Sequence, residues 1–149
     1  MKMFDRSDKA RFFGCLLLIG TVLVTHAADF TCDNLTVNGK LKQGSGTSAN
    51  GYVAVAEGAS TSASGDGSHA EGVSSTASGW GSHAEGWGTI ASATNAHAEG
   101  AGAQAAGYAS HAEGYFTYAK GSTAHAEGYT SKAYGTAGYA EGQGTISSN

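Results

Sequence analysis

The stretch SHAEGVSSTASGWGSHAEG (residues 68–86) decides the fold, because its first five residues return unchanged 14 positions later. The triplet Ala-Glu-Gly occurs seven times at this interval, without insertion, from residues 56–58 to residues 140–142. Each repeat is numbered here from its glycine as column 1. Residues 44–141 then hold seven full repeats, and residues 142–149 hold half of an eighth. A fixed period of this length indicates a repeat architecture.

The glycine positions favour strands over helices. Column 1 is always Gly, and column 8 is Gly in six of eight repeats. Each such Gly would destabilise a helix by about 1 kcal/mol relative to Ala. Because Gly reaches positive φ without strain, the two columns are expected to mark corners between strands of about five residues. The sequence therefore predicts an all-β chain, a parallel β-solenoid of 14-residue coils.

Alternation along each strand predicts which side chains point inward. A coil of 14 residues encloses little volume, so the small residues of columns 4, 6, 11 and 13 are expected inside. Columns 12 and 14 must then point outward, because a buried unpaired carboxylate is prohibitively costly. We call these two columns the His/Glu ladder. It consists of His69, His83, His97, His111, His125, Glu57, Glu71, Glu85, Glu99, Glu113, Glu127 and Glu141.

The His/Glu ladder has two interpretations. An interior made mainly of alanine buries little apolar area, so we expect subunits to associate through the ladder and gain stability. In this interpretation the ladder is structural, each His bonding a Glu of a neighbouring coil or chain, and the chain needs no cofactor. Imidazole and carboxylate also bind zinc, so a metal site is the alternative. Because imidazole titrates near neutrality, oligomer stability is expected to depend on pH.

Aromatic side chains gather beside the expected corners. They fall mainly in columns 2 and 9, and exposed aromatics are common in binding surfaces. Stacking between coils, to cover the corner backbone, is the alternative role. The candidate binding surface comprises Trp80, Trp87, Tyr108, Tyr115, Phe116 and Tyr129.

The N-terminal segment is typical of a secretory signal peptide. Residues 2–11 carry four basic residues, residues 12–24 are largely apolar, and small residues follow. This pattern predicts a signal peptide over residues 1–27, a strand and cap over 28–43, and repeats over 44–149. Cleavage would remove Cys15 and leave Cys32 as the single cysteine. The remaining chain has four lysines and no basic stripe, which disfavours nucleic acid, and no second apolar run to span a membrane.

The repeated Ser-His-Ala-Glu-Gly, preceded by segments such as Thr76-Ala77-Ser78-Gly79, resembles the head repeats of YadA-like trimeric autotransporter adhesins, also called Hep/Hag repeats. The resemblance covers residues 44–149. It implies a left-handed parallel β-roll that forms a homotrimer and adheres to a host matrix or cell-surface protein. It also implies an exported chain, located at the cell surface, associated with the outer membrane, or secreted. The sequence has no heptad run like that of the family's stalk.

Two function classes remain after these observations, and two others are disfavoured. The leading hypothesis is a non-enzymatic adhesion module, and the alternative is a structural spacer or fibre component without a specific ligand. An ice-binding solenoid would need an exposed, flat row of threonine pairs, whereas Thr in column 4 is followed by Ala in column 6. An enzyme is disfavoured because a catalytic centre combines unlike residues once, not five equal copies.

Overall fold

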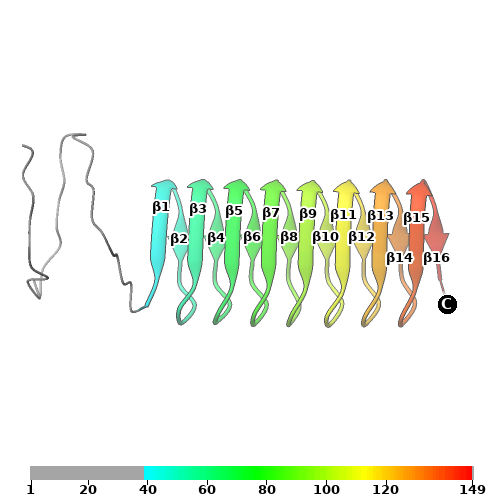
Figure 1. The fold of residues 1–149 in the computed structure, drawn as a ribbon, viewed down its shortest axis with the longest axis horizontal. Helices are drawn as coiled ribbons and strands as arrows, with labels where there is room; N and C mark the ends of the chain where they lie inside the picture. Colours follow the sequence, from blue (N-terminus) through cyan, green and yellow to red (C-terminus); the bar gives the residue numbers. More distant parts are fainter. Residues whose placement is uncertain (1–38, 149) are drawn as a thin grey trace, which may run out of the picture. The chain divides into compact units, whose positions relative to one another are not determined.

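A computed structural model describes residues 39–148, which form a parallel β-solenoid (Figure 1). Each coil contributes one strand to each of two eight-stranded sheets, and the register advances by 14 residues from strand to strand, as in His69 beside His83. This confirms the predicted solenoid of 14-residue coils. The proposed signal peptide, Cys15 and Cys32 lie outside the described residues.

The two sheets differ in strand length. The long sheet contains β1 (Leu41–Ser45), β3 (Val55–Ala59), β5 (His69–Val73), β7 (His83–Trp87), β9 (His97–Ala101), β11 (His111–Tyr115), β13 (His125–Tyr129) and β15 (Tyr139–Gln143). The short sheet contains β2 (Ser48–Ala49), β4 (Ser62–Ala63), β6 (Thr76–Ala77), β8 (Ile90–Ala91), β10 (Gln104–Ala105), β12 (Tyr118–Ala119), β14 (Lys132–Ala133) and β16 (Ile146–Ser147). Within 39–148, no helix is long and apolar enough to cross a bilayer.

The strand lengths correct the expectation of two similar strands per coil. Strands of the long sheet have five residues and those of the short sheet have two. The residues that were expected to extend each short strand form a turn instead. In one such turn, the amide of Ser68 donates to the carbonyl of Gly65 at 3.1 Å. The long sheet is therefore the more extended of the two sheet surfaces.

Glycine in columns 1 and 8 serves close packing between coils rather than the sharpest turns. Gly86, in column 1, lies inside β7 with φ of 111°, and a Cβ there would be 2.1 Å from the carbonyl oxygen of Gly100. Gly107, in column 8, has no positive φ, yet its Cβ would be 1.9 Å from the oxygen of Gly121. The left-handed residues lie instead in columns 3 and 10, as in Ser74. Column 1 therefore has the expected positive φ, but inside a strand rather than at a corner, and the expectation of positive φ in column 8 is wrong.

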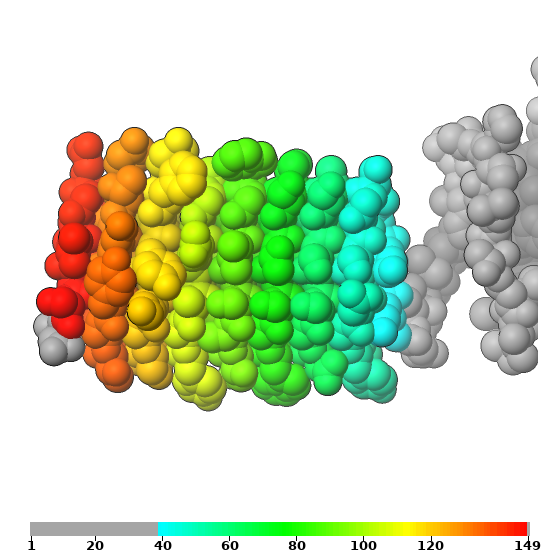
Figure 2. Space-filling view, turned by 180° about the vertical axis from the view of Figure 1, so that it is seen from behind, coloured from blue at the N-terminus to red at the C-terminus, as the bar shows by residue number. Residues whose placement is uncertain are grey.

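Small side chains fill the interior, as the alternation predicted. The core cluster consists of alanines, which are at most 2% exposed, and buried Ser and Thr lie beside them in columns 4 and 11. Serine hydroxyls within the core donate to backbone carbonyls, Ser82 to Gly79 at 2.8 Å and Ser131 to Gly142 at 2.8 Å. These bonds offset the cost of burying hydroxyl groups. The view from behind shows the coils as parallel bands (Figure 2).

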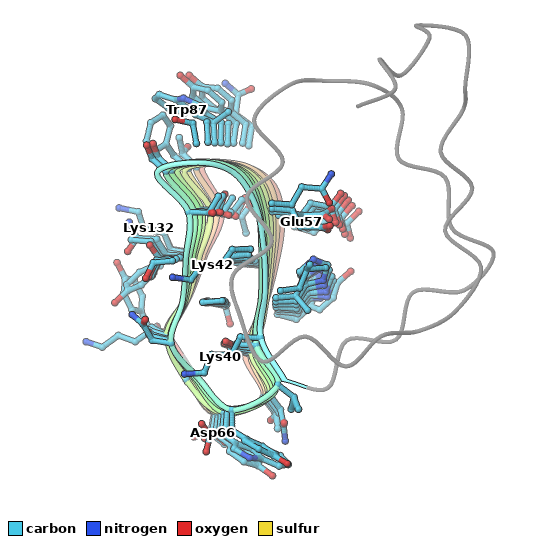
Figure 3. The ribbon with its side chains drawn as sticks, turned by 90° about the vertical axis from the view of Figure 1, so that its left-hand side faces the viewer. Lys40, Lys42, Glu57, Asp66, Trp87 and Lys132 are labelled. Carbon is cyan, nitrogen blue, oxygen red and sulfur yellow. The ribbon has the colours of Figure 1, made fainter. Side chains whose placement is uncertain are left out.

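The first coil carries lysine where later coils carry small core residues. Lys40 and Lys42 occupy columns 11 and 13, and Lys42 pairs with the buried Ala56 of the next coil. In Figure 3 both labelled lysines lie within the outline of the roll at its end. Charged side chains at the edge of a sheet oppose pairing with another strand. Residues 39–43 are the part of the proposed 28–43 cap that the structure describes.

Candidate functional site: the His/Glu ladder

The His/Glu ladder lies on the outer face of the long sheet. Parallel in-register pairing places each His beside the His of the next coil, and each Glu beside the next Glu. His and Glu are two residues apart on one strand, so both point to the same side. Figure 3 shows Glu57 projecting from this side, opposite Lys132 on the short sheet. The predicted outward orientation is confirmed.

The imidazole rings form one continuous stack. Ring centroids are 4.8 Å apart between His69 and His83 and 4.9 Å apart between His83 and His97, with interplanar angles of 3° and 8°. Further along, the rings tilt, by 33° between His97 and His111 and by 49° between His111 and His125. Tyr139 continues the stack from His125 at 4.9 Å. The ladder is therefore most regular over its first three histidines.

Hydrogen bonding within the ladder is incomplete. His69 Nε2 lies 3.4 Å from Glu57 of the previous coil, and His125 Nε2 lies 3.3 Å from Glu127 on its own strand. The corresponding distances for His83 and His111 to the glutamate on their own strands are 4.0 and 3.7 Å. The Nε2 atoms of His83, His97 and His111 are covered from solvent and have no hydrogen-bond partner among residues 39–148. The expected His-to-Glu bonding therefore forms at both ends of the row and not in its middle.

The environment of His111 disfavours its protonated form. Burial lowers the pKa of His111 below its ordinary value of 6.5, and the neighbouring rings of His97 and His125 lower it further. Glu113 and Glu99 act in the opposite direction but more weakly. At the end of the ladder, the hydrogen bond from the Tyr139 hydroxyl to Glu141, at 3.0 Å, raises the pKa of that phenol.

The lowered pKa of His111 predicts loss of stability in acid. Because the pKa of the His111 imidazole is lower in the folded chain than in the unfolded chain, its contribution to the free energy of unfolding is complete above about pH 6.5. It is lost as the pH falls through the folded-state pKa. In metal-free buffer, we expect a lower melting temperature at pH 5 than at pH 8, and a smaller loss for His111→Gln. Equal losses for the two proteins would contradict the prediction.

The six aromatic residues of the candidate binding surface lie on two separate edges. Trp87, Tyr115 and Tyr129 are the last residues of long strands and Phe116 follows one, whereas Trp80 and Tyr108 lie in the turns after short strands. Figure 3 shows Trp87 at one end of the coil cross-section and Asp66, which shares column 9 with Trp80, at the other. The sequence placed these residues beside corners correctly, but two corners on opposite edges do not give one continuous surface.

The edge that carries Trp87 contains the two contacts found between residues of the candidate binding surface. Tyr115 stacks on Tyr129 with centroids 5.1 Å apart, and Phe116 packs edge-on against Tyr115 at 4.6 Å. Stacking between coils is thus real for these residues, yet they remain 45–50% exposed. A shallow hollow of about 320 Å³ adjoins Phe116 and Tyr118. This edge therefore offers aromatic surface to a partner.

The inner threonines of column 4 are not available to a ligand. Thr61, Thr89 and Thr117 are at most 1% exposed, because column 4 points into the core. The ice-binding hypothesis needs these side chains on the surface and therefore loses its basis.

Comparison of the chain with protein-family models, curated proteins and solved structures found no match.

Proposed function

We propose that this chain is an exported, non-enzymatic adhesion module that acts as a homotrimer, like the heads of YadA-like trimeric autotransporter adhesins. The observation that carries the proposal is the contrast between the faces of the solenoid. The long sheet presents the same His and Glu in successive coils, whereas the outward residues of column 5 change from Ser62 to Ile90 to Lys132. A surface that repeats without change suits contact with identical copies.

The geometry of the ladder supports its assignment to the subunit contact. The face consists of five-residue strands in register, and the side chains of four of its five histidines keep 29–36% of their area exposed. Association would bury this remaining area. Because the interior contains mainly alanine, a single chain gains little from its own core. The interface would then leave the aromatic edges free for a host matrix or cell-surface protein.

Sedimentation equilibrium tests the trimer. We expect the full chain, 14.9 kDa, to sediment with three times that mass. Glu99→Arg places a bulky cation in the middle of the ladder and should shift the mass toward the monomer. Ser92→Arg makes the same addition on an exposed residue next to β8 and should leave the trimer intact. A wild-type chain that sediments as a folded monomer would refute the proposed contact.

Binding of the same samples to immobilised extracellular-matrix proteins separates adhesion from the alternative, a spacer or fibre component. We expect the trimer to bind, and the double variant Trp87→Ala/Tyr115→Ala to bind at least tenfold more weakly. The matched variant Trp80→Ala/Tyr108→Ala changes the opposite edge and should bind normally. A stable trimer that binds none of the proteins would favour the spacer.

A further inference from the structure

Three consecutive groups in the ladder have the composition of metal sites. Each contains one imidazole nitrogen and one carboxylate oxygen from each of two glutamates, and within a group these donor atoms lie within 4.8 Å of one another. The groups are centred on His69, His83 and His97. They consist of Glu57, His69 and Glu71; of Glu71, His83 and Glu85; and of Glu85, His97 and Glu99.

The repeat itself produces this arrangement. His and the second Glu of each group share a strand face, and in-register stacking adds the Glu of the previous coil, as when Glu57 pairs with Glu71. His69 Nε2 accordingly lies 3.4 Å from Glu57 and 3.6 Å from Glu71. Donors from two coils thus converge on one side of each ring without any distortion of the backbone.

A second observation indicates that the groups of His83 and His97 are incomplete, whereas His69 Nε2 already has Glu57 as a partner at 3.4 Å. The Nε2 atoms of His83 and His97 are shielded from solvent, yet nothing in residues 39–148 hydrogen-bonds to them. A buried polar atom without a partner costs free energy, which a bound cation would offset. A neutral imidazole with two carboxylates suits Zn²⁺, and three protein donors leave one position of a tetrahedral ion for water.

We propose that the ladder binds divalent transition-metal cations of the Zn²⁺ type in alternate groups, at His69 and His97, giving two ions per chain. All donors come from a single chain. The inference therefore goes beyond the proposed adhesion function and holds whether or not chains associate.

Shared ligands limit the number of ions. The group of His83 uses Glu71 and Glu85, and each of these also belongs to a neighbouring group. The groups of His69 and His97 have no residue in common, so four carboxylates neutralise two divalent ions there. A third ion would find no further carboxylate. An ion at His83 would also lie one coil, about 4.8 Å, from each of the other two ions. The Coulomb repulsion between ions one coil apart is twice that between ions two coils apart.

The two remaining histidines do not form equivalent groups. Their rings tilt, by 33° between His97 and His111 and by 49° between His111 and His125. In the described part of the chain, neither His111 nor His125 belongs to a three-donor group. His125 therefore provides a matched control within the same column.

The test is the stoichiometry of Zn²⁺ bound by the tag-free full chain. The chain is alkylated so that its cysteines do not contribute, stripped with a chelator, titrated with ZnCl₂ by calorimetry, and assayed for bound metal. We expect two ions per chain for the wild type and for His125→Gln. His83→Gln should also keep two, whereas His69→Gln and His97→Gln should each keep one. Co²⁺ should give the absorption of a tetrahedral site with the same counts.

Two outcomes would overturn the inference. Binding of no Zn²⁺ by a folded wild-type chain would exclude the site. Three ions per chain, with one lost in each of His69→Gln, His83→Gln and His97→Gln, would refute alternate occupancy. Circular dichroism verifies that each variant folds. Sedimentation of the same samples reports the oligomer separately, so a failure of the trimer proposal and a failure of metal binding give different results.

Discussion

Replacing Gly86 by alanine is expected to lower the free energy of unfolding by about 4 kcal/mol. Two effects combine at this residue. Its φ of 111° lies in a region that side chains rarely adopt, and its new Cβ would lie 2.1 Å from the carbonyl oxygen of Gly100. The obstacle is backbone of the next coil, so no side chain can rotate away. Chemical denaturation monitored by circular dichroism measures the loss.

Two glycine controls separate these effects. Gly88, two residues along the chain, has φ of 63° and nothing within 4 Å of an added Cβ, so Gly88→Ala should cost only about 1 kcal/mol. Gly107 has no positive φ but has the close approach to Gly121, so Gly107→Ala should cost about 2 kcal/mol. Similar losses for Gly86→Ala and Gly88→Ala would show that the coils separate easily, contrary to the close packing described above.

Enlarging the core at Ala105 is expected to cost about 3 kcal/mol when alanine becomes leucine. Ala105 is fully buried on β10, and the residues around it in the roll are alanine, serine and threonine. None of these neighbouring side chains is large enough to make room for leucine by changing its rotamer. The sheets would have to move apart, which would weaken hydrogen bonds in the adjoining coils. Thermal and chemical denaturation measure the effect.

The adjacent residue provides the control for Ala105. Ala106 follows β10 immediately and is exposed, so Ala106→Leu adds the same atoms outside the roll. Its effect should remain within about 0.5 kcal/mol, as for ordinary surface substitutions. If the two variants lost equal stability, the interior would be roomier than a 14-residue coil allows.

The arrangement of inward and outward residues was predictable from sequence. Strict alternation in Ser-His-Ala-Glu, combined with an interior too small for imidazole, left one orientation for each column. The burial of Ser82 and Ala84 and the outward position of His83 follow from these two constraints. These orientations could be predicted without the structure of the neighbouring coil, because each coil stacks on a coil of nearly the same sequence.

Details of the turns were not predictable in this way. Phe116 and Thr123 adopt left-handed φ values of 51° and 54°, although neither residue type favours them. Hydrogen bonds between successive turns hold this geometry, such as Phe116 N to Ala101 O at 2.8 Å. Glycine in column 1 has the expected positive φ, but it lies inside a strand and permits close approach to the next coil instead of forming a corner. Period alone does not distinguish the two uses of glycine.

By itself, the sequence determined the period, the parallel register and the side of the sheet on which His and Glu lie. These follow from a 14-residue repeat and from alternation, which are properties of one coil. Only the tertiary structure decided that the aromatic residues divide between two edges. It also decided that His83 and His97 each lie beside two glutamates while their Nε2 atoms have no hydrogen-bond partner within residues 39–148. Such features depend on distances between coils and on ring rotation, and these are set by packing rather than by the order of residues.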